Sequence, residues 1–165
     1  MKKIVFVRHA KSDHHFGLED IDRPLSPQGK RDAATMAGVL KTRGVVPQRI
    51  ISSGSLRTLT TVQIFIKELD IFDCLVVDNR LYMGDSSKYL SVIHEIDNDC
   101  DTVAIVGHNP VISEVCELLS GASVGTLSPC AICAITFAAN GFDLITPSSG
   151  SLEFFDSPNA FRRPT

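Results

Sequence analysis

Four apolar residues near the start of the chain, residues 4–7, run directly into Arg8 and His9. A continuous apolar run this short is typical of a strand buried on both faces, as in the centre of a parallel sheet. In open α/β sheets, ligands bind outside the carboxyl ends of the strands. The run therefore places Arg8 and His9 where a ligand would bind, although this pair alone could equally well do no more than end a strand.

Length and composition predict one globular domain over residues 1–165, with 44% hydrophobic and 21% charged residues. The net charge of −3 provides no overall field that would attract nucleic acid or an anionic membrane, so neither is expected as a partner. Any affinity for phosphate must come from a local cluster of cations. The apolar run after the N-terminal lysines is too short for a signal peptide, and no segment reaches membrane-spanning length. We therefore expect a cytoplasmic protein.

Strands and helices are predicted to alternate along most of the chain. Further strands are expected at residues 49–52, 74–77 and 102–107, and apolar residues at helical spacing follow each of them. Ser26-Pro27 is a typical helix start, with serine as the N-cap and proline in the first turn. This alternation predicts a three-layer α/β/α sandwich with a mostly parallel central sheet.

The C-terminal part predicts an antiparallel edge to this sheet. Asn140-Gly141 separates the apolar residues 131–138 from residues 142–145, and Asn-Gly between two apolar runs is a strong hairpin signal. Residues 151–165 are rich in Ser, Pro and Arg, so we expect a surface tail with room for one short strand.

Three strand-to-helix junctions each carry a cationic or imidazole side chain. His9 and His108 follow two different buried strands, and Arg57 lies in the first turn of the helix after residues 49–52. Backbone N–H groups at a helix start and a guanidinium both favour anions. Because the strand ends meet at one edge of a parallel sheet, the three side chains together predict an anion-binding site.

The chain resembles the histidine phosphatase superfamily, whose founding fold is the cofactor-dependent phosphoglycerate mutase. The resemblance extends over about residues 1–150. It rests on three motifs in order, Arg8-His9-Ala10, Ser52-Ser53-Gly54-Ser55-Leu56-Arg57 and Val106-Gly107-His108-Asn109-Pro110. More narrowly, the short chain is similar to the small bacterial SixA-type phosphohistidine phosphatases, through Lys11-Ser12, Asp22-Arg23-Pro24-Leu25-Ser26 and Leu81-Tyr82.

The resemblance implies a role for each matching residue. His9 matches the nucleophile that accepts the phosphoryl group, and Arg8, Arg57 and His108 match the groups that bind its oxygens. Arg23 matches a further substrate-binding arginine, on a loop. Three guanidinium groups and an imidazole could neutralise a phosphoryl group without a metal or cofactor. His9 can attack only as a neutral imidazole, so we expect a partner, such as a backbone carbonyl, for its other ring nitrogen.

One departure from the family concerns the leaving group. Relatives that cleave alcohol esters carry a glutamate as general acid after the third strand, but residues 80–84 contain no carboxylate. The nearest is Asp85, which is also a preferred N-cap for the helix that follows. Both roles remain open, and we favour the cap.

Several of these residues also have a plain structural interpretation. Arg23 could form a surface ion pair with one of its acidic neighbours, Glu19, Asp20 and Asp22. Asp13, His14 and His15 could suggest a metal site, but adjacent side chains point in different directions, and no metal is expected. Cys130 and Cys133 have CxxC spacing inside an apolar run, so we interpret them as small core residues of a strand.

The sequence thus favours a metal-independent phosphatase that works through a phosphohistidine intermediate, most directly on phosphohistidine in proteins. Two alternatives are a small-molecule phosphomonoester phosphatase and a non-catalytic phosphate-binding module, and the presence of His9 favours an enzyme. A mutase is a third and weaker alternative. The expected partners are a phosphorylated protein or small substrate, with phosphate or vanadate as a ligand of the site.

Overall fold

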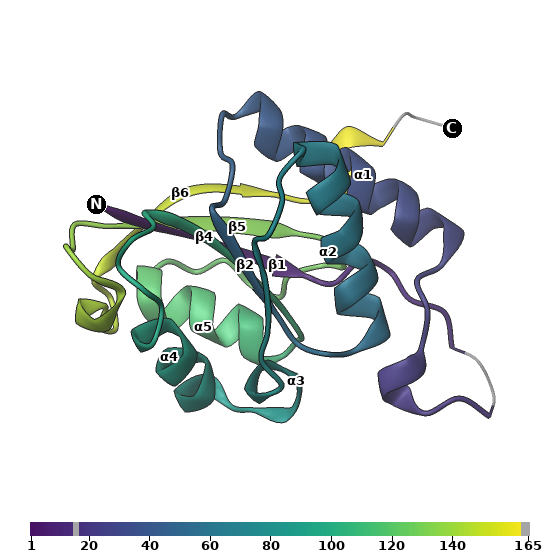
Figure 1. Cartoon of the computed structure of the whole chain (residues 1–165), viewed down its shortest axis with the longest axis horizontal. Helices are drawn as coiled ribbons and strands as arrows, with labels where there is room; N and C mark the ends of the chain where they lie inside the picture. Colours follow the sequence, from purple (N-terminus) through teal and green to yellow (C-terminus); the bar gives the residue numbers. More distant parts are fainter. Residues whose placement is uncertain (15–16, 163–165) are drawn as a thin grey trace.

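A computed structural model describes residues 1–14 and 17–162, and it places one sheet between two layers of helices (Figure 1). The strands are β1 (Lys2–Arg8), β2 (Arg49–Ser52), β3 (Leu75–Val77), β4 (Thr102–Gly107), β5 (Ile132–Phe137) and β6 (Gly150–Asp156). The helices are α1 (Pro27–Thr42), α2 (Leu56–Leu69), α3 (Arg80–Met83), α4 (Ser86–His94) and α5 (Val111–Ser120). Short 3₁₀ turns lie at Asp20–Asp22, Phe142–Leu144 and Pro158–Phe161.

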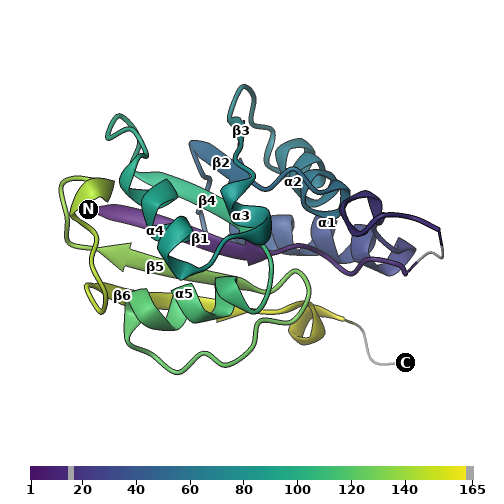
Figure 2. The ribbon, with the colours of Figure 1, turned by 90° about the horizontal axis from the view of Figure 1, so that it is seen from below.

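The sheet is mostly parallel with an antiparallel edge, as predicted. Its strand order is β3-β2-β4-β1-β5-β6. The β3–β2, β2–β4 and β4–β1 pairs are parallel, whereas β5 runs antiparallel to both β1 and β6. Figure 2 shows β1 and β4 running side by side, with their carboxyl ends at the same edge. The three-layer α/β/α prediction is confirmed.

The central strand β1 separates the two halves of the core. Ile4 and Phe6 pack in the cluster that includes residues of α4 and α5, and Val5 and Val7 pack in the cluster of α1 and α2. All four side chains are fully buried. Burial on both faces is the reason this run shows no polar alternation.

The loop that follows His9 is held against the start of α1. The Ser26 side chain accepts a hydrogen bond from the Gly29 N–H (2.9 Å), and the Ser26 N–H donates to the Lys11 carbonyl (2.9 Å). A β-carbon at position 29 would collide with the same Lys11 carbonyl, so glycine permits the close approach. The predicted serine cap therefore also anchors the loop on the carboxyl side of β1.

The predicted C-terminal hairpin is wrong. Residues 142–145 do not form a strand: Phe142–Leu144 is a 3₁₀ turn, and the Phe142 ring is buried in the core cluster on the α4 and α5 side. The strand that pairs with β5 is β6, within the segment expected to be mostly surface tail. Burial of Phe142 turns the chain inward after Asn140-Gly141. The sequence did not predict the extent of β6 because a largely exposed edge strand shows little apolar alternation.

No helix among residues 1–14 and 17–162 is both long enough and apolar enough to cross a membrane.

Two adjacent phenylalanines of β6 offer a test of this edge assignment. Phe154 is 8% exposed and lies beneath the Arg43 guanidinium, 4.2 Å from the ring centroid, whereas Phe155 is 37% exposed. We expect Phe154→Ala to lower the free energy of unfolding by about 3 kcal/mol, because it empties a packed position. Phe155→Ala should cost less than about 1 kcal/mol. Urea denaturation of both variants measures the difference, and equal losses would contradict the placement of β6.

Candidate active site

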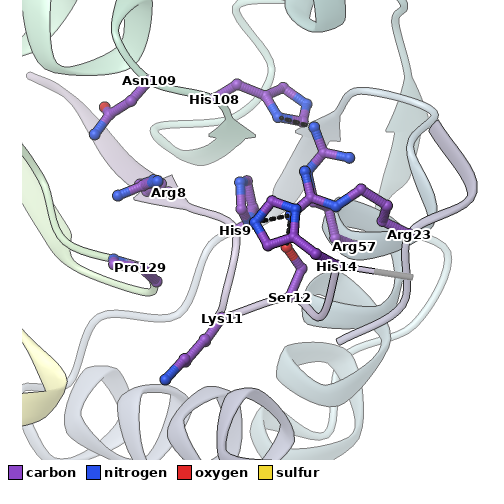
Figure 3. A pocket seen from close by; sticks show the side chains of 10 residues that line it. All are labelled: Arg8, His9, Lys11, Ser12, His14, Arg23, Arg57, His108, Asn109 and Pro129. Carbon is purple, nitrogen blue, oxygen red and sulfur yellow. Dashed lines mark hydrogen bonds between the residues drawn. The ribbon is translucent and has the colours of Figure 1, made fainter. Parts of the chain in front are cut away.

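Strand pairing brings the two histidines together at the carboxyl edge of the sheet. Arg8 of β1 pairs with Gly107 of β4, so His9 and His108 occupy the next position on neighbouring strands. The His9 N–H donates to the Gly107 carbonyl (3.2 Å), and the two imidazole centroids are 5.3 Å apart. Each residue is only 8% exposed. The predicted meeting of these side chains is confirmed (Figure 3).

The backbone of His108 is fixed by Tyr89 of α4. The Tyr89 hydroxyl accepts a hydrogen bond from the His108 N–H (3.2 Å) and donates one to the Leu81 carbonyl (2.8 Å). A β-carbon at position 107 would collide with this hydroxyl, so the motif requires glycine there. On the ring, Nε2 of His108 lies 2.7 Å from the Ser53 hydroxyl, which follows β2. Tyr89 thus fixes the backbone of His108, and Ser53 fixes its imidazole.

His9 is held as a neutral imidazole with one defined free nitrogen. Its Nδ1 lies 2.8 Å from the Ala10 carbonyl oxygen, and a carbonyl can only accept, so Nδ1 carries the proton and Nε2 the lone pair. Burial lowers the pKa of His9 to about 3, with His108, Arg57 and Arg8 adding to the effect. The expected backbone partner of this ring is therefore present.

A cavity of about 460 Å³ opens in front of these histidines, and cationic side chains dominate its wall (Figure 3). The lining residues are Arg8, His9, Lys11, Ser12, His14, Arg23, Arg57, His108, Asn109 and Pro129, with no carboxylate among them. Arg57 lies in the first turn of α2, after the N-cap Ser55. The arrangement suits a ligand with concentrated negative charge.

Two buried guanidinium donors support this assignment. Nε of Arg8 and Nε of Arg57 have no hydrogen-bond partner within the described residues. Arg8 itself is positioned by the bond from Nη1 to the Leu127 carbonyl (2.9 Å). Buried unpaired donors are costly, on the order of 1–3 kcal/mol each. Because both arginines line the cavity, an anion bound there would compensate their positive charge.

Arg23 lines the cavity and is also held by its own loop. Its Nη2 donates to the Ser12 hydroxyl (2.7 Å), its Nε to the Asp13 carbonyl (3.3 Å), and its Nη1 pairs with Asp20 (3.0 Å). The surface ion pair that the sequence allowed is thus formed, with Asp20. It does not remove Arg23 from the cavity wall.

Asp20 and Tyr82 are the polar groups of this region whose positions the sequence did not reveal. The Asp20 carboxylate contacts Arg23, Arg57 and the Tyr82 hydroxyl, and the Tyr82 ring meets His108 edge-on at 5.3 Å between centroids. Hydrogen bonds from Tyr82, then Arg23 and Arg57, hold the pKa of Asp20 well below its usual range. The nearby run Asp-Ile-Asp-Arg pointed to an ion pair but not to a contact with α2 or α3.

Asp85 is the N-cap of α4, the role that we favoured from the sequence. Its carboxylate accepts from the Lys88 N–H (3.1 Å) and the Ser87 hydroxyl (2.7 Å), and these bonds lower its pKa. It is not among the residues that line the cavity. The alternative role of Asp85 as a general acid therefore receives no support from its position.

The cysteines lie apart from this chemistry, whereas His14, one of the possible metal ligands, lines the cavity. Cys133 is a buried residue of β5, whereas Cys130 is buried just before that strand with φ +62°, so only one of the pair is a strand residue. Burial raises the pKa of the Cys130 thiol. His15 falls outside the described residues. Among those described, no cluster of three His, Cys, Asp or Glu side chains could hold a metal ion.

Comparisons with known proteins agree with this geometry. Residues 4–82 match the family model of the histidine phosphatase superfamily (branch 1). An uncharacterized chloroplastic protein of Arabidopsis thaliana is 29% identical over 96% of this chain and 79% of its own length. An uncharacterized protein of Mycobacterium leprae is 31% identical over 70% of this chain and 71% of its own. The protein histidine phosphatase SixA, solved with tungstate, superposes with a TM-score of 0.84 at 21% identity, over 97% of this chain and 99% of SixA.

The burial of both histidines predicts their titration. The pKa of His9 is lowered to about 3 and that of His108 to about 4, so both rings should stay neutral between pH 5 and 8. Ring ¹⁵N chemical shifts measured by NMR should be flat over this range, and the same histidines in urea-unfolded protein should titrate near pH 6.5, at about the unperturbed value. An inflection near pH 6.5 for His9 in the folded protein would contradict a buried neutral imidazole.

Proposed function

This chain belongs to the histidine phosphatase superfamily and is a phosphatase, and we propose that it is a metal-independent phosphohistidine phosphatase whose nucleophile is His9. The observation that carries the proposal is the state of the His9 ring. It is neutral, its Nδ1 proton is engaged by the Ala10 carbonyl, and it lies among the guanidinium groups of Arg8 and Arg57. A non-catalytic phosphate-binding module would need only the cations.

In the first step, Nε2 of His9 attacks phosphorus and the bond to the leaving group breaks. Charge that spreads over the three equatorial oxygens is met by Arg8, Arg57 and Arg23. The imidazole becomes cationic as the N–P bond forms, and the Nδ1–H bond to the Ala10 carbonyl (2.8 Å) stabilises that charge. The cationic side chains perform the neutralisation that a metal ion performs elsewhere.

In the second step, water attacks phosphorus and the N–P bond to His9 breaks. The electron pair of that bond returns to Nε2, and inorganic phosphate is released. Protonated imidazole-like groups are good leaving groups because the free imidazole has a pKa of about 6.5. Because imidazole leaves readily, the phosphoenzyme is a short-lived intermediate, and a phosphohistidine substrate is favoured in the first step.

Within the part of the chain that the structure describes, no carboxylate lines the cavity, and this supports the choice of substrate. An alkyl phosphate expels an alkoxide, and protonation by a general acid accelerates such steps by roughly 10²–10⁴-fold. Asp85 caps α4, and Asp20 is kept ionised by its three partners, so neither is suited to donate a proton. The likeness in fold to SixA, described as a protein histidine phosphatase, supports the same substrate class.

Trapping of the intermediate tests the nucleophile. Rapid acid-free quenching with ³²P-labelled substrate should give a phosphoenzyme that is stable in alkali and labile in acid, because the label is on a ring nitrogen. His9→Ala should abolish the label. His94→Gln is the matched control, since His94 lies on α4, outside the cavity wall, and its ring contacts the Ile145 carbonyl. Label that survives in His9→Ala would exclude this mechanism.

The preference for leaving groups tests the substrate class. We expect kcat/KM for a phosphohistidine peptide and for p-nitrophenyl phosphate to exceed that for a phosphoserine peptide by at least about 100-fold, since only the last needs an acid. Asp85→Asn should leave all three values within about twofold. Comparable rates on phosphoserine, lost in Asp85→Asn, would instead identify Asp85 as the acid and an ordinary ester as the substrate.

A further inference from the structure

We propose that Asp20 is a positioning residue that holds the guanidinium of Arg57 in the orientation required at the phosphoryl transition state. This inference rests on the proposed function, because it assigns to Arg57 the role of binding the transferred group. Asp20 itself lies outside the wall of the cavity and does not touch the reacting atoms.

Both terminal nitrogens of Arg57 are bound by this one residue. Nη1 donates to the backbone carbonyl of Asp20 (2.7 Å), and Nη2 donates to its carboxylate oxygen Oδ2 (3.0 Å). Two bonds to one residue fix the plane of the guanidinium as well as its position. Burial of the Arg57 side chain, which is 8% exposed, limits its freedom further.

The Asp20 carboxylate is in turn held by Arg23 of its own segment and by Tyr82 of α3. Its Oδ1 accepts from Arg23 Nη1 (3.0 Å), and its Oδ2 accepts from the Tyr82 hydroxyl (2.5 Å). Arg23 belongs to the segment between β1 and α1, Arg57 to α2 and Tyr82 to α3. A carboxylate bound from three segments has little freedom, so the orientation it imposes on Arg57 is well defined.

The two bonds to Asp20 use only two of the five N–H donors of the Arg57 guanidinium. Nε of Arg57 is buried without a partner in the described structure, as is Nε of Arg8, and both arginines line the cavity. Asp20 is not among the residues that line the cavity, so it binds Arg57 from outside the space that a ligand would occupy. This placement favours positioning over competition.

Small errors in orientation matter most at the transition state. Preorganised donors act on charge that develops on the equatorial oxygens, and a misplacement of about 1 Å can cost about 100-fold in rate. A buried Arg57 released from Asp20 would remain near the cavity and still attract a phosphate dianion. We therefore expect loss of Asp20 to reduce kcat much more than ground-state binding.

The test compares Asp20→Asn and Asp20→Ala with Asp22→Asn. Asp22 lies on the same 3₁₀ turn and is exposed, and within the described residues its side chain makes no hydrogen bond or ion pair, so its variant removes an equal charge without touching Arg57. With p-nitrophenyl phosphate, both Asp20 variants should lose about 10- to 100-fold in kcat with KM within about threefold of wild type. Asp22→Asn should match wild type, and thermal melts confirm that all variants fold.

Inhibition constants separate positioning from other roles. Vanadate resembles the five-coordinate transition state, and phosphate resembles the ground state. In the Asp20 variants, the affinity for vanadate should therefore fall in parallel with kcat, whereas the affinity for phosphate should fall by less than about threefold. Tyr82→Phe, which removes one support of Asp20, should show a smaller loss of the same kind. If the Asp20 variants bind phosphate more tightly than wild type, Asp20 is an anion that competes with the substrate. If their kcat and inhibition constants equal those of Asp22→Asn, Asp20 only forms a surface ion pair. Either result overturns the proposal.

Failure of the proposed function would be recognised separately. If the wild-type protein hydrolyses none of these compounds, the phosphatase proposal fails, and calorimetric titration with vanadate still decides the role of Asp20. Weaker vanadate binding in Asp20→Asn than in Asp22→Asn would support the positioning of Arg57. Equal binding would exclude it.

Discussion

The parallel pairing of β1 with β4 is the contact on which the site depends. Because Arg8 lies opposite Gly107, the residues that follow, His9 and His108, leave the sheet side by side. A shift of this register would separate the rings and also turn Arg8 to the other face of the sheet. Core packing on both faces of β1 opposes such a shift, since Ile4 and Phe6 fill one half of the core and Val5 and Val7 the other. Catalytic geometry and core packing are therefore fixed by the same strand.

Burial then determines what these side chains can do. Removal of both imidazoles from water keeps them neutral, and the nearby guanidinium groups further oppose protonation, so His9 retains a lone pair. The positive charge that would oppose protonation of His9 also attracts the substrate. The Asp20 carboxylate contacts Arg57, Arg23 and Tyr82, and Asp20 is not among the residues that line the cavity. Among the described residues no carboxylate lines the cavity, and Asp20 orders two of its arginines, Arg57 and Arg23.

The lack of an acid at the cavity follows from local helix chemistry. In the segment after β3, the first carboxylate beyond residue 80 is Asp85, and its oxygen is used to cap α4 through the Lys88 N–H. The residue that approaches the site from this segment is Tyr82, whose hydroxyl donates to Asp20. The segment thus supports the arginines and offers no acid for a leaving group, which is the chemical basis of our proposal that phosphoramidates are the substrates.

The sequence by itself determined the α/β architecture, the buried strands β1 and β4, and the meeting of His9, His108 and Arg57, because strand ends in a parallel sheet converge whatever the details of packing. It also identified Ser26 and Asp85 as caps, since capping depends on residues three positions apart. Only the tertiary structure decided that residues 142–145 turn inward while β6 forms the sheet edge, because burial of Phe142 outweighs a local turn signal. It alone decided where Asp20 lies: the contacts with Arg57 and Tyr82 join residues 37 and 62 positions away, and no local pattern encodes a distance of that kind.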